Sequence, residues 1–201
     1  LLRTQVAEAR ERRRAAIATR RETITGVTDF PLLDAVLPEF EPRVSSTQAV
    51  GDFASIRWAE PFETLRAKAE ATSPRVFFAT LGALAEFSPR TQWTRNLFAA
   101  GGVASLGAED AYASMDALID AFRASKTRVA LIAGADAAYS AQAENAAQRL
   151  KAAGADWVLL AGKPGDRESV LRAAGVDQFV FAGQNALQEL DTLHTALGLA
   201  P

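Results

Sequence analysis

The chain has 201 residues, of which 49% are hydrophobic and 23% are charged, and its formal net charge is −2. This composition is that of a globular protein long enough for one full domain and a further segment, and it excludes a disordered chain. The balanced charge gives no reason to expect nucleic acid or a membrane surface as a partner. No run of about 18 apolar residues is available to span a membrane. The lack of cysteine excludes disulfides and thiolate sites.

The first segment, residues 1–21, is rich in Ala, Arg and Glu and predicts a helix. Seven arginines lie in it: Arg3, Arg10, Arg12, Arg13, Arg14, Arg20 and Arg21. They suggest an anion-binding stripe, but Glu8 and Glu11 interrupt the positive run, and no aromatic side chains lie between the arginines to stack on bases. We therefore expect a solvated helix, or one that packs on another domain. Because the chain opens inside this pattern without a methionine, we expect it to be part of a longer polypeptide.

A β-branched run, residues 23–28, predicts a short buried strand that ends at the Asp-Phe-Pro of residues 29–31. Periodicity is then lost from residue 32 to about residue 57, where several prolines occur. Such a long irregular stretch is uncommon within a compact domain, so we interpret it as an interdomain linker. A helix is expected at residues 60–71, with a proline near its start.

From Pro74 onward, five apolar runs alternate with helical patterns. Strands are expected at residues 75–80, 103–106, 128–133, 157–161 and 178–182, and helices at residues 91–100, 110–124, 138–153, 168–174 and 186–199. This alternation predicts right-handed βαβ units and a parallel sheet covered on both faces. The fold class expected is therefore α/β, a flavodoxin-like (Rossmann-like) five-stranded parallel sheet of order 2-1-3-4-5. A ligand would bind at the carboxyl ends of its strands.

Three ligand-binding patterns of such folds do not fit. A dinucleotide site needs G-x-G-x-x-G after the first strand, whereas residues 81–86 read LGALAE. Residues 162–165, GKPG, do not match a phosphate-binding P-loop. A phosphorelay receiver needs an acidic pair after the first strand, an aspartate after the third and a lysine after the fifth, and Asp136 alone is present. We expect Asp136 to be a loop or helix-capping residue.

The single histidine, His194, falls in the last predicted helix, away from the carboxyl edge of the sheet. It has no second histidine and no organised carboxylate partner in the sequence, so we expect a surface histidine rather than a general base or metal ligand. The residues by themselves therefore assign no catalytic group and no metal site.

Several motifs resemble methylmalonyl-CoA mutase subunits. Residues 19–31, TRRETITGVTDFP, resemble the end of that family's TIM barrel, where a helix leads into the last strand. Residues 75–82 (RVFFATLG), 87–90 (FSPR) and 96–102 (NLFAAGG) resemble the terminal domain of the small subunit, which partners a large catalytic one. The resemblance covers nearly the whole chain.

This resemblance implies that the chain consists of three parts. Residues 1–31 would be the end of a truncated TIM barrel, residues 32–73 an interdomain linker with one short helix, and residues 74–201 a cobalamin-binding-like α/β domain. It also implies a cytoplasmic subunit of the adenosylcobalamin-dependent isomerase that interconverts methylmalonyl-CoA and succinyl-CoA.

The family's cobalamin-binding domains carry D-x-H-x-x-G after the first strand. The histidine is the lower ligand of cobalt, the aspartate orients it, and the glycine leaves room for the nucleotide tail. Ala85, Phe87 and Arg90 stand at these positions, and phenylalanine cannot ligate cobalt. The family's serine near the end of strand three and its glycine pair after strand four correspond to Ala135–Ala137 and Ala161-Gly162. The resemblance therefore implies a vestigial slot at Ala85, Phe87, Arg90, Ala135, Ala161 and Gly162.

The resemblance further implies a heterodimer in which the homologous large subunit binds adenosylcobalamin and catalyses the reaction, while this chain binds no cofactor and supports its partner. We also expect Ser88-Pro89 to cap and start the helix after strand one. Phe87 or Trp93 would then fill the space of the dimethylbenzimidazole, unless both rings simply belong to the core or to an interface.

The alternative is a domain that binds another small ligand or effector at the same crevice, where Ser88, Arg90, Thr91 and Gln92 would grip an anion. Against this, we expect Arg90 to be a surface or interface residue. A cobalamin enzyme with a different lower ligand is a third interpretation, which the lack of a suitable histidine disfavours.

Overall fold

The computed structural model describes residues 2–34 and 56–199, so much of the predicted linker, residues 35–55, lies outside the described residues. The sheet consists of β1 (Arg75–Leu81), β2 (Ala104–Leu106), β3 (Val129–Gly134), β4 (Trp157–Ala161) and β5 (Gln178–Val180). All neighbouring strands pair in parallel, and their order is β2-β1-β3-β4-β5. The predicted fold class and strand order are confirmed.

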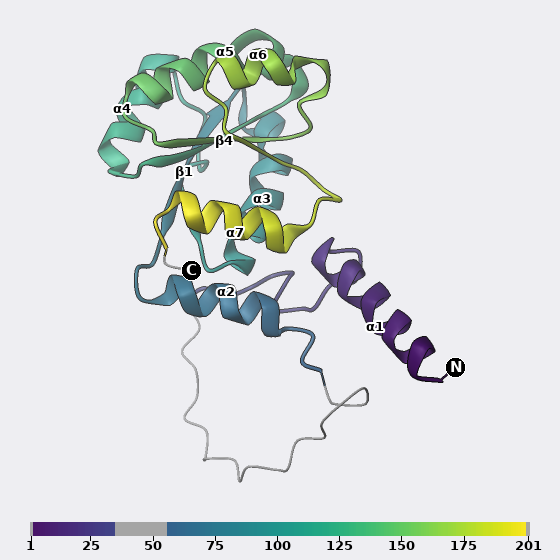
Figure 1. Cartoon of the computed structure of the whole chain (residues 1–201). Coiled ribbons are helices and arrows are strands. Elements are labelled where there is room, and N and C mark those ends of the chain that lie inside the picture. The colour runs from purple at the N-terminus through teal and green to yellow at the C-terminus, as the bar shows by residue number, and fades with distance from the viewer. Residues whose placement is uncertain (1, 35–55, 200–201) are drawn as a thin grey trace.

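Helices cover both faces of the sheet (Figure 1). One face carries α3 (Leu84–Ala100) and α7 (Ala186–Ala196), and the other carries α4 (Met115–Ser125), α5 (Asp136–Ala152) and α6 (Glu168–Ala173), which follows the 3₁₀ turn η1 (Gly165–Arg167). Because side chains alternate along a strand, β1 supplies both cores. Val76 and Phe78 pack with α3 and α7, whereas Phe77 packs with α4 and α5.

Two helices precede the sheet. α2 (Glu60–Glu70) lies beneath α7 and buries Phe62 and Leu65 in the same core as that helix (Figure 1). α1 (Leu2–Ala18) extends away from the sheet and buries only Ile17 and Ala18. Both predicted helices are confirmed, and the arginine-rich one is exposed along most of its length.

The predicted strand at residues 23–28 is wrong. The backbone there folds into a turn in which the Ile24 carbonyl accepts the N–H groups of Val27 and Thr28, and the Thr28 hydroxyl accepts from the Ile24 N–H. Gly26, at φ +77, allows the reversal, and only an isolated bridge joins Thr25 to Asp29. The β-branched residues signal extended backbone, but local hydrogen bonds satisfy this segment instead.

The predicted start of the helix after β1 is also wrong. Ser88 and Pro89 do not cap α3, which begins at Leu84 and contains Pro89. The N-terminus is set by Glu86, whose carboxylate accepts the Ala83 N–H at 2.6 Å. The Ser88 hydroxyl instead donates back to the Leu84 carbonyl, so residues 84–90 are helical rather than an open loop.

Candidate functional site

A cleft of about 550 Å³ lies where the carboxyl ends of β4 and β5 meet the middle of α3 and the start of α5. Its lining includes Arg90, Trp93, Asp136, Gly162, Lys163 and Phe181. This is the edge at which parallel α/β sheets bind ligands. The cleft therefore lies at the carboxyl ends of the strands, where the sequence predicted a ligand site. The side chains that line it determine which ligands could bind there.

Arg90 reaches from α3 across the end of β3. Its guanidinium donates to the carbonyl of Gly134 and, at 2.5 Å, to the carboxylate of Asp136, and it lies 4.7 Å from the ring centre of Tyr139. Burial opposes its charge, yet the hydrogen bond with Asp136 raises the pKa of Arg90 above its ordinary value. The guanidinium is therefore engaged by its own protein and ties α3 to α5.

The buried hydroxyl of Tyr139 links the ends of β3 and β4 by hydrogen bonds. Its hydroxyl donates to the Ala161 carbonyl at 2.7 Å and accepts the Gly134 N–H at 3.1 Å. Burial of the side chain raises the pKa of Tyr139 to about 12. A Cβ added at Gly162 would lie 3.4 Å from Cε2 of Tyr139 and 3.8 Å from Cζ of Arg90, so these two side chains pack closely over the strand end.

We call Arg90, Asp136 and Tyr139 the latch. Sequence reasoning missed Tyr139, although a tyrosine in the first turn of a helix whose other inward positions are mostly alanines was a usable signal. Arg90 is partly exposed, with 31% of its side chain accessible, and its charged end is bound within the domain; the expectation that it is a surface or interface residue stays a prediction. Asp136 is neither a loop nor a capping residue, since it is the first residue of α5 and pairs with Arg90.

The six residues of the predicted slot do not all come together. Arg90, Ala161 and Gly162 line the cleft, and Ala135 immediately precedes α5 at the same edge. Ala85 is exposed in the first turn of α3, whereas Phe87 is completely buried in the core beneath that helix. Of the two rings considered as fillers of the slot, Trp93 lines the cleft and Phe87 belongs to the core.

The four side chains considered for gripping an anion do not converge either. Ser88 and Thr91 direct their hydroxyls to backbone carbonyls of α3 itself. Gln92 is exposed and is not among the residues that line the cleft, and Arg90 is held in the latch. A ligand at this edge would therefore have to compete with contacts that the domain already makes.

His194 contradicts the expectation of a surface histidine. Its residue is only 3% exposed, Nε2 lies 2.8 Å from the Gly101 carbonyl, and Nδ1 has no partner among the described residues. Desolvation lowers the pKa of His194 below its ordinary value, which favours the neutral ring. Within residues 2–34 and 56–199, no group of three or more His, Cys, Asp or Glu side chains is arranged to hold a metal ion, and no helix is long and apolar enough to cross a membrane.

The parallel sheet, its strand order and the cleft at its carboxyl edge define a flavodoxin-like α/β domain. No known family profile matches the chain. A CheY-like protein (tadZ) from Pseudomonas aeruginosa PAO1 aligns in structure with a TM-score of 0.46 and 22% identity, over 63% of this chain and 95% of that one.

Curated relatives are similar over almost the entire chain. The methylmalonyl-CoA mutase small subunit of Streptomyces virginiae is 36% identical over 94% of this chain and 30% of its own length. A probable methylmalonyl-CoA mutase small subunit of Mycobacterium bovis is 36% identical over 96% of the chain and 31% of its own length, and the small subunit of Propionibacterium freudenreichii subsp. shermanii is 28% identical over 98% and 31%. The chain is homologous to the C-terminal part of methylmalonyl-CoA mutase small subunits and spans about a third of the length of these relatives.

Proposed function

We propose that this chain is a segment of the non-catalytic subunit of an adenosylcobalamin-dependent methylmalonyl-CoA mutase. It supports a homologous large subunit, with which it forms a heterodimer, and it has lost its own cobalamin site. The subunit role is supported by the names of the relatives, which are small subunits. In this proposal the interconversion of methylmalonyl-CoA and succinyl-CoA takes place on the partner.

The residues at the family's cofactor positions do not fit cobalamin. The position of the cobalt-ligating histidine is held by Phe87, which is buried in the core, and the chain's one histidine lies elsewhere, against Gly101. The ends of β3 and β4, where the nucleotide tail would enter, are covered by Arg90 and Tyr139. The latch is the main observation in support of the proposed loss of the site, because Arg90 and Tyr139 occupy space that the nucleotide tail of cobalamin would need.

The domain boundaries belong to the same proposal. Residues 1–31 would be the end of the preceding TIM barrel, residues 32–73 the linker, and residues 74–201 the cobalamin-binding-like domain. The helix at residues 2–18 and the sheet that begins at residue 75 are compatible with this division. The turn at residues 24–29 is not a strand, so the barrel assignment depends on the resemblance of residues 19–31.

Co-expression of the full-length protein with its candidate large subunit tests the proposal. We expect a stable heterodimer on gel filtration that retains a single cobalamin, and we expect the small subunit by itself to retain none after incubation with hydroxocobalamin. Two cobalamins in the heterodimer would overturn the loss of the site. Failure of the two chains to associate would overturn the supporting role.

The cleft of about 550 Å³ beside the latch favours one second candidate, a domain that binds a small effector at this edge. Such a domain would bind its ligand without the large subunit. A ligand-dependent rise in melting temperature that Lys163→Gln removes, measured on the small subunit alone, would favour this candidate over a purely supporting role.

A further inference from the structure

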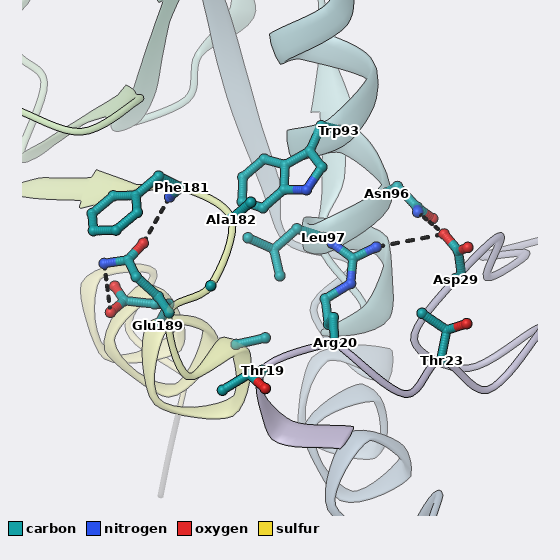
Figure 2. A pocket seen from close by; sticks show the side chains of 13 residues that line it. Thr19, Arg20, Thr23, Asp29, Trp93, Asn96, Leu97, Phe181, Ala182 and Glu189 are labelled. Carbon is teal, nitrogen blue, oxygen red and sulfur yellow. Dashed lines mark hydrogen bonds and ion pairs between the residues drawn. The ribbon is translucent and has the colours of Figure 1, made fainter. Parts of the chain in front are cut away.

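A second cavity, of about 270 Å³, lies between the segment that follows α1, the outer side of α3 and the loop from β5 to α7. Figure 2 shows Arg20, Thr19 and Thr23 on one side of it and Phe181 and Glu189 on the other, with Trp93 and Leu97 between them. None of the six residues of the predicted cobalamin slot lines this cavity.

Arg20 is the unusual group in this cavity. Its side chain is only 11% exposed, and Nε and Nη1 are buried without a hydrogen-bond partner among the described residues. Nη2 lies 3.5 Å from Oδ1 of Asp29, beyond the usual hydrogen-bond range of about 2.7–3.2 Å. Burial lowers the pKa of Arg20, and the charge of Asp29 only partly offsets this effect.

The contrast with Arg66 shows that this fold can satisfy a partly buried guanidinium. Arg66 donates to the carbonyls of Val27 at 2.8 Å, Gly26 at 3.1 Å and Ala100 at 3.3 Å. Buried charged donors are rarely left without partners in native proteins, because the loss of hydration is then uncompensated. Arg20 therefore calls for an acceptor beyond those that the described residues supply.

We propose that this cavity binds a small organic monocarboxylate, whose carboxylate pairs with Arg20 and whose apolar part lies against Trp93 and Leu97. A guanidinium and a carboxylate form short, charge-assisted hydrogen bonds that are stronger than those between neutral groups. Asp29 and Glu189 also line the cavity and would repel a dianion more strongly than a monoanion, so we expect a ligand with a single negative charge. Pairing requires the guanidinium plane to turn toward the cavity, away from its long contact with Asp29.

The size and lining of the cavity restrict the ligand further. Its volume lies below the roughly 300–1,000 Å³ of pockets for drug-sized molecules, so an acid of a few carbons fits and a coenzyme does not. The Glu189 carboxylate is held by the side-chain amides of Gln178 at 2.8 Å and Gln184 at 3.1 Å, so it stays on its own wall of the cavity. This inference is independent of the proposed mutase role.

The test uses the full-length protein, with n-butyrate as the probe and n-butylamine, 1-butanol and inorganic phosphate as matched controls. Isothermal calorimetry should show saturable binding of butyrate alone among the four. Arg20→Gln should weaken this binding at least tenfold while keeping or raising the melting temperature of the ligand-free protein, because it removes a buried charge whose ion-pair contact with Asp29 is long. Arg12→Gln, at an exposed arginine of α1, should bind butyrate like the parent.

A second variant covers the case in which Arg20→Gln does not fold. Ala182 is exposed at the rim of the cavity, so Ala182→Phe should block butyrate binding with Arg20 intact and the fold unaffected. The proposal is overturned if the parent binds no butyrate, if phosphate binds in its place, or if either variant binds butyrate as well as the parent does.

Discussion

Tyr139 stabilises the carboxyl edge of the sheet through one hydroxyl, which is both donor to Ala161 and acceptor from Gly134. Tyr139→Phe leaves the ring in place but removes the hydrogen bond that each of these backbone groups makes with the hydroxyl. We expect the free energy of unfolding to fall by about 1–2 kcal/mol, the usual effect of leaving buried groups unsatisfied. Urea denaturation measures this loss.

Tyr112→Phe is the matched control, because the Tyr112 hydroxyl makes only a long contact of 3.4 Å with the Phe78 carbonyl. Its effect should stay within about 0.5 kcal/mol, since that contact is too long for a strong hydrogen bond. Equal losses in the two variants would contradict the role given to the Tyr139 hydroxyl.

His194 should make stability depend on pH. Desolvation lowers the pKa of His194 in the folded state below its ordinary value of 6.5; the hydrogen bond with Gly101 and the charge of Asp191 oppose this shift, and the charge of Lys68 reinforces it. The unfolded chain therefore takes up a proton first as pH falls, so stability is fully present above about pH 6.5 and declines below it, down to the folded-state pKa. Urea midpoints at several pH values between about 7.5 and 5 should fall more steeply for the parent than for His194→Gln. Parallel profiles would show that the decline has another origin.

Helix α3 determines whether the cofactor site can be restored. Because α3 begins at Leu84, Phe87 is directed into the core rather than into the cleft. We expect Phe87→His combined with Ala85→Asp to yield no histidine-ligated cobalamin, and to destabilise the domain by about 3 kcal/mol through the loss of buried apolar volume. The visible spectrum of hydroxocobalamin mixed with the double variant, and retention of colour on gel filtration, measure this.

The control for that experiment adds Arg90→Gly to the same two substitutions, which opens the latch without moving residue 87. This triple variant should also fail, because α3 still directs residue 87 inward. Tight, stoichiometric, histidine-ligated cobalamin in the double variant would show that the slot remains open and that the core position of Phe87 is no obstacle. The same result in the triple variant alone would show that the latch, and not the core position of residue 87, blocks the site.

At the scale of the whole molecule, an exposed apolar stretch follows the turn at residues 24–29. Phe30 is 78% exposed and Leu32 is 70% exposed, although Asn96 holds the segment by accepting the Phe30 N–H at 2.8 Å. Neighbouring exposed apolar side chains in a defined position are typical of a surface that contacts other protein. We expect them to contribute to the proposed heterodimer.

Phe30→Ser together with Leu32→Ser should weaken association of the full-length protein with the large subunit at least tenfold, since burial of each such side chain contributes about 1.5–3 kcal/mol. Sedimentation velocity measures the association. Val170→Ser, at an exposed apolar residue of α6, serves as the control and should change nothing. Unchanged association of the double variant would exclude these two residues from the interface.

The sequence by itself determined the alternation of strands and helices from residue 75 onward. Buried strands such as residues 129–134 are continuous apolar runs, and the chain between them carries helical periodicity, so these signals are local. The strand order was the one expected of a flavodoxin-like fold, and the relationship to mutase small subunits followed from short motifs. The start of α3 and the turn at residues 24–29 were mispredicted, because side-chain and backbone hydrogen bonds there overrode the proline and β-branched signals.

Only the tertiary structure decided what the carboxyl edge contains. Arg90 meets Gly134 across 44 residues of sequence, and His194 meets Gly101 across 93. Neither contact leaves a periodic or compositional signal, because each depends on how two helices pack against the same sheet. The same holds for Arg20, which the sequence placed in an exposed stripe and the fold buries beside a cavity. Local patterns specify elements, whereas the partners of buried polar groups are set when those elements pack.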